Sequence, residues 1–183
     1  METVVDRLYS DFRELVNHLD AARQISLRSA AEENFRKSIL LAAASYFEHS
    51  LNQDILAFVN EASYQNRILL SFVKNKALSR QFHSLFDWDS SNANKFFALF
   101  GEEFKSFMNV ELQRNDPLAS SVKAFLEIGR ERNRLVHQDF GSYSLEKTAE
   151  EIYELYRNAL DFVQVVVAKM RQCVEDAKPH DHP

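Results

Sequence analysis

The sequence predicts an all-α fold, a single helical bundle of about five to seven helices. Only three glycines and three prolines occur among 183 residues, which leaves little material for hairpins or long loops. Apolar side chains recur at helical spacing through most of the chain, and no repeat or linker divides it. We expect one domain over residues 1–177 and a polar, disordered tail over 178–183.

Helical periodicity recurs in five segments before the last two helices, at residues 3–22, 28–61, 67–78, 80–86 and 87–115. The second of these is apolar nearly all round between Ile39 and Phe47, which indicates the centre of the fold. The fifth is rich in phenylalanine and is expected to contain two short helices that break near Gly101.

The last two helices have recognisable termini. Asp116-Pro117 predicts a helix start, because the missing proline N–H costs nothing in the first turn. This helix is expected to stop near Gly141, and Ser142 or Ser144 is expected to cap the last long helix.

Composition limits the function. The net charge of −5 disfavours a protein that coats nucleic acid non-specifically, but it permits an enzyme that contacts a few phosphates in a local basic pocket. We see no signal peptide and no apolar run long enough for a membrane span, so we expect a soluble, cytoplasmic protein without membrane contact. The histidines elsewhere, such as His83, are scattered, and we expect no metal and no cofactor.

The stretch "RNRLVH", which begins at Arg132, interrupts the pattern of its helix. On a helical projection, Arg130 and Arg134 lie on the solvated face, whereas Arg132 and Asn133 fall inside the apolar arc and His137 lies at its edge. A buried guanidinium costs several kcal/mol unless it is paired, so Arg132 requires an explanation. Taken alone, it is more often half of a structural ion pair, and a histidine at a helix end is more often a cap.

The combination Arg-Asn-x-x-x-His resembles the motif of the HEPN superfamily (higher eukaryotes and prokaryotes nucleotide-binding domain). The order of helices is similar, and the segment "FRKSILLAAASYFEHSLNQ" resembles the long early helix of the RiboL-PSP-HEPN branch. The resemblance covers roughly residues 28–175. It implies a metal-independent endoribonuclease that acts as a dimer, often as a toxin or phage-defence effector. It matches Arg132, Asn133 and His137 to the motif, and Glu48 to an acidic residue of the early helix.

These residue types suit RNA cleavage without metal. The ribose 2′-OH attacks the adjacent phosphorus and leaves a 2′,3′-cyclic phosphate and a 5′-OH. Histidine can exchange protons near neutral pH, and the arginine fork can stabilise the charge on the phosphorane oxygens.

Arg132 and His137 lie about 140° apart on a straight helix, so one copy is not expected to aim both at one phosphate. Two copies related by a two-fold axis could present both pairs in one cleft, which favours a homodimer. Glu48 follows an apolar stretch, and we expect it to be desolvated and to pair with or orient Arg132. A purely structural salt bridge between the two helices is the alternative.

One HEPN subgroup has a tyrosine two residues after the histidine, which a partner antitoxin modifies. Here that position is Asp139, so control by that route is not expected, although another antitoxin or defence-system partner remains possible. Two other classes stay open: a non-catalytic HEPN module that binds nucleotide, RNA or proteins, and a plain helical scaffold.

Overall fold

A computed structural model describes residues 2–177, and within this range the chain forms eight α-helices and a short π-helical segment. The elements are α1 (Val4–Ala21), α2 (Ile25–Ala62), α3 (Arg67–Val73), η1 (Lys74–Leu78), α4 (Phe82–Leu85), α5 (Asn94–Ala98), α6 (Glu102–Arg114), α7 (Asp116–His137) and α8 (Ala149–Asp176). The predicted all-α class is confirmed. The number of helices is larger than five to seven because the short segments expected at 80–86 and on both sides of Gly101 form separate helices, α4, α5 and α6.

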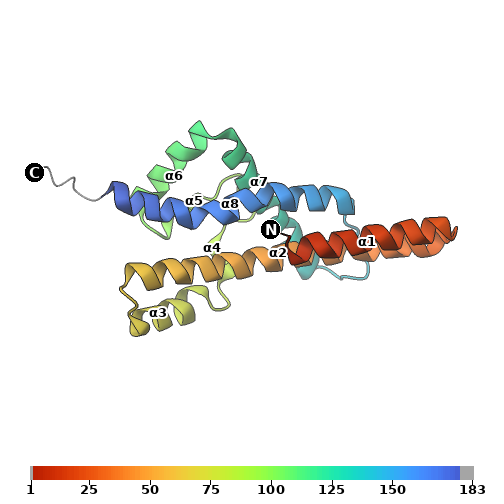
Figure 1. The fold of residues 1–183 in the computed structure, drawn as a ribbon, viewed down its shortest axis with the longest axis horizontal. Coiled ribbons are helices and arrows are strands. Elements are labelled where there is room, and N and C mark those ends of the chain that lie inside the picture. The colour runs from red at the N-terminus through yellow and green to blue at the C-terminus, as the bar shows by residue number, and fades with distance from the viewer. Residues whose placement is uncertain (1, 178–183) are drawn as a thin grey trace, which may run out of the picture.

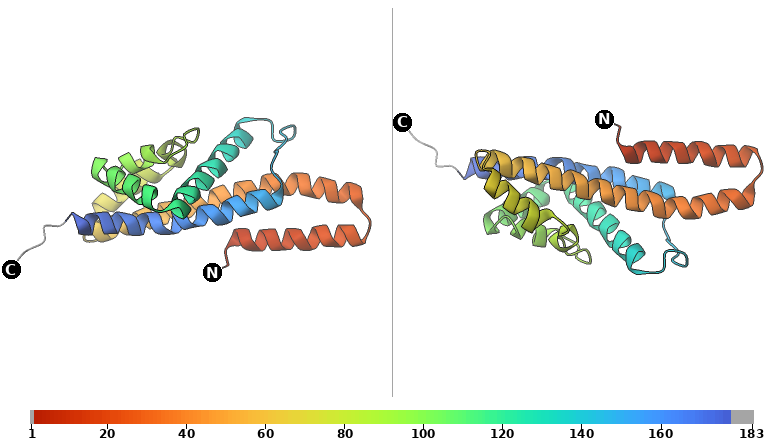
Figure 2. Two further views of the ribbon diagram at one scale, coloured as in Figure 1. Left: turned by 90° about the horizontal axis from the view of Figure 1, so that it is seen from above. Right: turned by 90° about the horizontal axis from the view of Figure 1, so that it is seen from below.

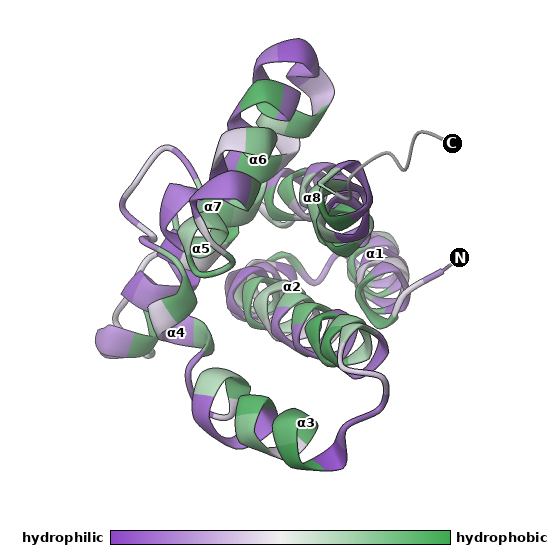
Figure 3. Ribbon diagram, turned by 90° about the vertical axis from the view of Figure 1, so that its left-hand side faces the viewer, coloured by the Kyte–Doolittle hydropathy of each residue, from purple (hydrophilic) through white to green (hydrophobic). Residues whose placement is uncertain are grey.

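The long helices α2 and α8 run side by side and form the axis of the molecule (Figure 1). α1 folds back along the first half of α2 (Figure 2), and α7 crosses between the two long helices. Viewed along the axis, α3 and α4 lie on one side of α2 and α6 lies near α7 and α8 (Figure 3). No helix among residues 2–177 combines the length and apolar character needed to cross a membrane.

Aromatic side chains fill the centre where α2, α7 and α8 meet. Phe125 of α7 lies 5.5 Å from Phe47 of α2 and 5.1 Å from Phe162 of α8, measured between ring centroids. Tyr156 stacks on Phe47 at 5.4 Å, and all four rings are almost fully buried. Edge-to-face and offset contacts of this kind add to the free energy gained by burial, so this cluster fixes α7 between the long helices.

The first turn of α1 is tied to α8 by a network around Asp6. Thr3 donates its backbone N–H and its hydroxyl to the Asp6 carboxylate, at 2.7 and 2.9 Å. The Tyr153 hydroxyl donates to the same group at 2.8 Å, and Arg157 pairs with it at 3.3 Å. The Tyr156 hydroxyl donates to Thr3 at 2.6 Å, and burial raises the pKa of Tyr156 to about 12. Helix capping and tertiary contact therefore use the same carboxylate.

Two predicted helix ends differ in the structure. α7 ends at His137, because Gln138 is extended and the Asp139 carboxylate accepts hydrogen bonds from the Gly141 N–H and the Ser142 hydroxyl. Such local bonds compete with continuation of a helix. α8 begins after Thr148 instead of after Ser142 or Ser144, because Thr148 and Glu151 form a reciprocal capping box. The predicted start at Asp116-Pro117 and the break at Gly101, whose φ is +101°, are confirmed.

The Asp6 network predicts a pH-dependent stability. Burial by itself raises the pKa of Asp6, but the hydrogen bonds from Thr3 and Tyr153 and the charge of Arg157 outweigh it, so the pKa lies below the ordinary 3.8. The stabilisation is therefore complete above the ordinary pKa and disappears as the pH falls through the lower, folded-state value. We expect Asp6→Asn to lower the free energy of unfolding by about 1–3 kcal/mol at pH 7 in urea titrations, with a smaller difference in acid. Asp11→Asn, on the exposed face of α1, is the control; an Asp6→Asn effect equal at pH 7 and pH 2.5 would contradict the assignment.

Candidate functional site

The two halves of α7 have different surroundings. Its first half is packed in the core, whereas its C-terminal end diverges from α8 (Figure 2). Val136, in the last turn, and Phe140, just after the helix, are 45% and 46% exposed. The last turn of α7 is thus only partly packed, with Leu135 buried and Val136 exposed, and the polar residues beside Val136 can face a pocket instead of a core.

The chain after α7 is held by two cations of α2. Lys37, only 3% exposed, donates its ammonium to the Phe140 carbonyl at 2.8 Å and lies 5.1 Å from the centre of the Phe140 ring. Arg36 donates to the Leu145 carbonyl at 3.0 Å and pairs with Glu33. Charge-assisted hydrogen bonds from a buried lysine resist displacement, so the position of the α7 end relative to α2 is fixed through this segment.

All four residues predicted for the site line one pocket of about 490 Å³, here called the Arg132 pocket. Arg132, Asn133 and His137 come from the end of α7, and Glu48 comes from the middle of α2. Arg132 and Asn133 are partly buried and His137 is exposed. Residues 84 to 89 positions apart in sequence therefore face the same volume, as the resemblance implied for the acidic residue of the early helix.

Of the two pairings expected for Glu48 and Arg132, within one chain or across a dimer, the one within the chain is not formed, and the one across a dimer stays a prediction. Within residues 2–177, no ion pair within 4.0 Å involves either side chain, and Glu48 is partly exposed instead of fully desolvated. Arg132 instead donates to the amide oxygen of Asn133 at 3.1 Å. The guanidinium thus retains most of its five donors for a ligand, which a structural salt bridge would have occupied.

The pocket also contains residues that the motif does not include. Arg80, from the segment between η1 and α4, and His83, from α4, complete its wall. Arg80 has a positive φ of 60°, which is uncommon for a residue with a side chain and often marks a functional segment. Residues 62–86 contain four Lys or Arg and no Asp or Glu, a local charge bias opposite to that of the whole chain. That bias was the sequence signal for Arg80; for His83, nothing in its local spacing gave one.

Arg132 and His137 of one chain line the same pocket, whereas the expectation that one copy cannot aim both at one phosphate stays a prediction. Around the helix, positions 132, 136, 133 and 137 follow one another over about 140°, and all four line the pocket. A long arginine side chain and a wide pocket at a helix end bridge that angle. A second copy is therefore not needed to bring the two side chains to one volume.

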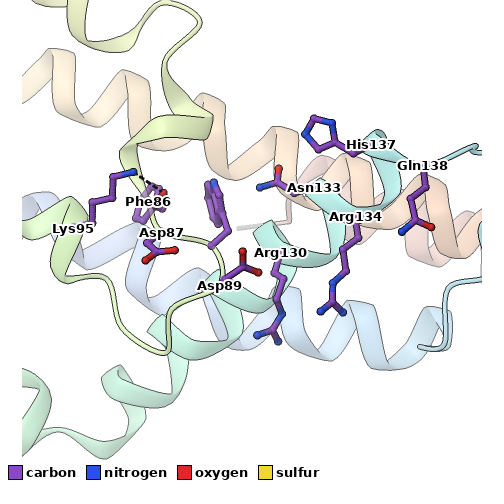
Figure 4. A pocket seen from close by; sticks show the side chains of 10 residues that line it. Phe86, Asp87, Asp89, Lys95, Arg130, Asn133, Arg134, His137 and Gln138 are labelled. Carbon is purple, nitrogen blue, oxygen red and sulfur yellow. Dashed lines mark hydrogen bonds between the residues drawn. The ribbon is translucent and has the colours of Figure 1, made fainter.

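Asn133 and His137 also border a second pocket of about 510 Å³ on the other side of α7, here called the Trp88 pocket. Its charged residues are Asp87, Asp89, Lys95, Arg130 and Arg134. Figure 4 shows the two aspartates in the loop that faces Arg130 and Arg134 of α7. The side chains of Asn133 and His137 therefore form a ridge between two pockets.

Trp88 reaches this wall because residue 129 is glycine. A Cβ at position 129 would lie 2.0 Å from two carbons of the Trp88 ring, a distance that no structure tolerates without movement. The Trp88 indole N–H donates to the His83 carbonyl at 2.9 Å, and the side chain is only 9% exposed. Gly129 thus allows the loop after α4 to pack directly on α7 and connects the walls of both pockets.

Comparison with known proteins agrees with the architecture. The family model of RiboL-PSP-HEPN matches residues 6–172, nearly the whole described chain. The chain therefore belongs to the RiboL-PSP-HEPN family and is a HEPN-type domain. No curated protein and no solved structure matches it significantly.

The contact between Gly129 and Trp88 predicts the result of a small substitution. We expect Gly129→Ala to lower the free energy of unfolding by about 1–3 kcal/mol, because the added methyl group must displace the ring. Trp88 is the sole tryptophan, so its displacement should shift the intrinsic fluorescence to the red. In the control Gly141→Ala the new Cβ would meet nothing closer than 3.6 Å, so it should change neither quantity. Equal behaviour of the two variants would refute the packing argument.

Proposed function

We propose that this protein is a cytoplasmic, metal-independent endoribonuclease whose active site is the Arg132 pocket. The proposal rests on one observation: Glu48 lines the same pocket as the three motif residues, although it lies far from them in the sequence. Membership of the RiboL-PSP-HEPN family supports the same reading.

The proposed reaction is a transesterification within the RNA strand. The 2′-oxygen forms a bond to phosphorus, the bond from phosphorus to the 5′-oxygen breaks, and the products carry a 2′,3′-cyclic phosphate and a 5′-OH. One proton leaves the 2′-OH and one is added to the departing 5′-oxygen, so the reaction requires a base and an acid.

We assign one proton transfer to His137 and the other to His83. Both imidazoles line the Arg132 pocket, from α7 and from α4. An imidazole can serve as acid or base near neutral pH, whereas an ionised carboxylate can serve only as a base. Glu48 is accordingly assigned to positioning Arg132 when RNA is bound.

Arg132 is assigned to the non-bridging phosphate oxygens, where its planar fork can stabilise the charge that develops in the phosphorane. The hydrogen bond to Asn133 at 3.1 Å holds the guanidinium on the pocket wall. Arg80 and the other cations of residues 62–86 supply an approach for the RNA backbone, which a chain with a net charge of −5 otherwise lacks.

A toxin or phage-defence role, a homodimer and an antitoxin or defence-system partner belong to the proposal through the family resemblance. Asp139 occupies the position at which one HEPN subgroup has a modifiable tyrosine, and here its carboxylate organises the turn after α7. We therefore propose that inhibition, where it occurs, acts by occlusion of the pocket and not by modification of this position.

The activity is tested by incubating structured and unstructured RNA with the protein in EDTA. We expect cleavage to 2′,3′-cyclic phosphate ends, and a fall of at least about 100-fold in Arg132→Ala and His137→Ala, because each removes a group that acts in the transition state. Arg7→Ala and His18→Ala, on the exposed face of α1, are matched controls that should retain full activity. Cleavage that persists in both pocket variants would refute the site. No cleavage by the wild type, with RNA still bound, would favour the non-catalytic module.

A mixing experiment tests which chain supplies the pair. Because one chain places Arg132 and His137 around one pocket, we expect an equimolar mixture of Arg132→Ala and His137→Ala dimers, after subunit exchange, to stay inactive. If the catalytic pair is instead shared between two chains, half of the sites in each mixed dimer contain both wild-type residues, and activity returns. Sedimentation of the same samples measures whether the dimer forms.

A further inference from the structure

We propose that the Trp88 pocket binds the base of a nucleotide next to the cleaved phosphodiester bond, and that Asp87 and Asp89 select guanine there. The inference rests on the proposed function, because it treats the Arg132 pocket as the site of cleavage. Its test below contains a measurement that does not need cleavage.

The Trp88 pocket lies next to the Arg132 pocket around α7. Going around α7 from Arg132, positions 133 and 137 lie at about 100° and 140°, and positions 130 and 134 lie at about 160° and 200°. The first two residues line both pockets, and the last two line the Trp88 pocket alone. An RNA strand whose phosphate lies against Arg132 and His137 therefore reaches the Trp88 pocket directly across the ridge formed by Asn133 and His137. Its volume of about 510 Å³ lies within the range of small-molecule sites.

The Trp88 pocket contains charged side chains of both signs. Asp87 and Asp89 face Lys95, Arg130 and Arg134, yet no ion pair within 4.0 Å joins these aspartates to any cation of the described chain. The Arg130 Nε is buried and has no hydrogen-bond partner there. Glu131 pairs with Arg134 at 3.0 Å and lies 3.9 Å from Arg130, so the pocket presents both signs of charge, and neither a simple anion nor a simple cation would meet favourable partners on every side. A nucleotide satisfies both sets, since its phosphate accepts from arginine and its base can donate to a carboxylate.

The choice of base follows from the donors that each base offers. An ionised carboxylate only accepts hydrogen bonds, and its two oxygens match two adjacent N–H donors. Guanine presents such a pair, N1–H and the 2-amino group, on its Watson–Crick edge. Adenine and cytosine present an amino group beside an acceptor nitrogen, and uracil presents one N–H between two carbonyls, which a carboxylate repels. Trp88 is largely buried but lines the same wall, so a bound base would lie close to its ring.

The first test uses fluorescence of Trp88, which is the sole tryptophan and lines the pocket. Titration with guanosine 5′-monophosphate, corrected for inner-filter absorption, is expected to quench the emission at a concentration at least about 10-fold lower than the adenosine, cytidine or uridine monophosphates require. Asp87→Asn and Asp89→Asn should abolish that difference, and Asp11→Asn on α1 should preserve it. Equal quenching by all four nucleotides, or by none, would overturn the inference whether or not the protein cleaves RNA.

The second test uses cleavage of oligonucleotides that differ at one position. We expect the preferred cleavage sites to have a guanosine on one side of the bond, with at least about a 5-fold loss of kcat/KM when inosine, which lacks the 2-amino group, replaces it. Replacement by 7-deazaguanosine, which keeps the Watson–Crick edge, should have no effect. Cleavage without a guanosine preference would overturn the inference while the proposed function stands. Selective quenching by the guanosine nucleotide without any cleavage would support the guanine site and overturn the proposed function.

Discussion

The packing of α7 against α2 and α8 is the constraint on which the site depends. Phe125 anchors α7 between Phe47 and Phe162, and the Phe162 amide donates to the Ser121 hydroxyl at 2.7 Å, so the first half of α7 is fixed in rotation as well as in position. The second half continues the same helix away from the core. Because the helix is continuous, the packing of its first half also fixes the rotation of its second half. The buried aromatic contacts therefore determine the direction of Arg132 about two turns further on.

A rigid helix end would still be a poor site if the chain after it were free to move. Lys37 addresses this, because it is a lysine that is almost fully buried on α2 and donates to the Phe140 carbonyl. Burial of an ammonium group is unfavourable without a hydrogen-bond partner. The segment after α7 must therefore keep the Phe140 carbonyl next to Lys37. α2 therefore contributes twice, with Lys37 holding the end of the α7 segment and Glu48 lining the Arg132 pocket about three turns further along the same helix.

The helical class, the break at Gly101 and the start at Asp116-Pro117 were predictable, because each depends on local backbone chemistry. The end of α7 was not predictable, because the turn at Asp139 competes with continuation of the helix. A helical projection does not compare the free energies of these two conformations. The pattern also marked Arg132 and Asn133 as exceptions in an apolar arc, which was correct, but assigned them to a buried face. Whether an arc is buried depends on where the neighbouring helix diverges, and that is a property of three helices together. For the same reason the sequence did not place Arg80 or His83 at the site: only the charge bias of residues 62–86 pointed to Arg80, and both residues reach the pocket through the tertiary fold.

The helical period explains why Arg130 and Arg134 could look like an ordinary solvated face and still be part of a second pocket. They lie only about 20° and 60° beyond His137 around α7, so any structure that covers that flank converts solvated cations into pocket walls. The loop with Trp88 provides the cover, and it can approach only because residue 129 has no side chain. Arginines at alternate positions 130, 132 and 134 are thereby divided between two pockets by the ridge of Asn133 and His137. A substitution on the ridge changes the wall of both pockets, whereas one at 130 or 132 changes a single pocket, so the two volumes can be altered independently from one helix.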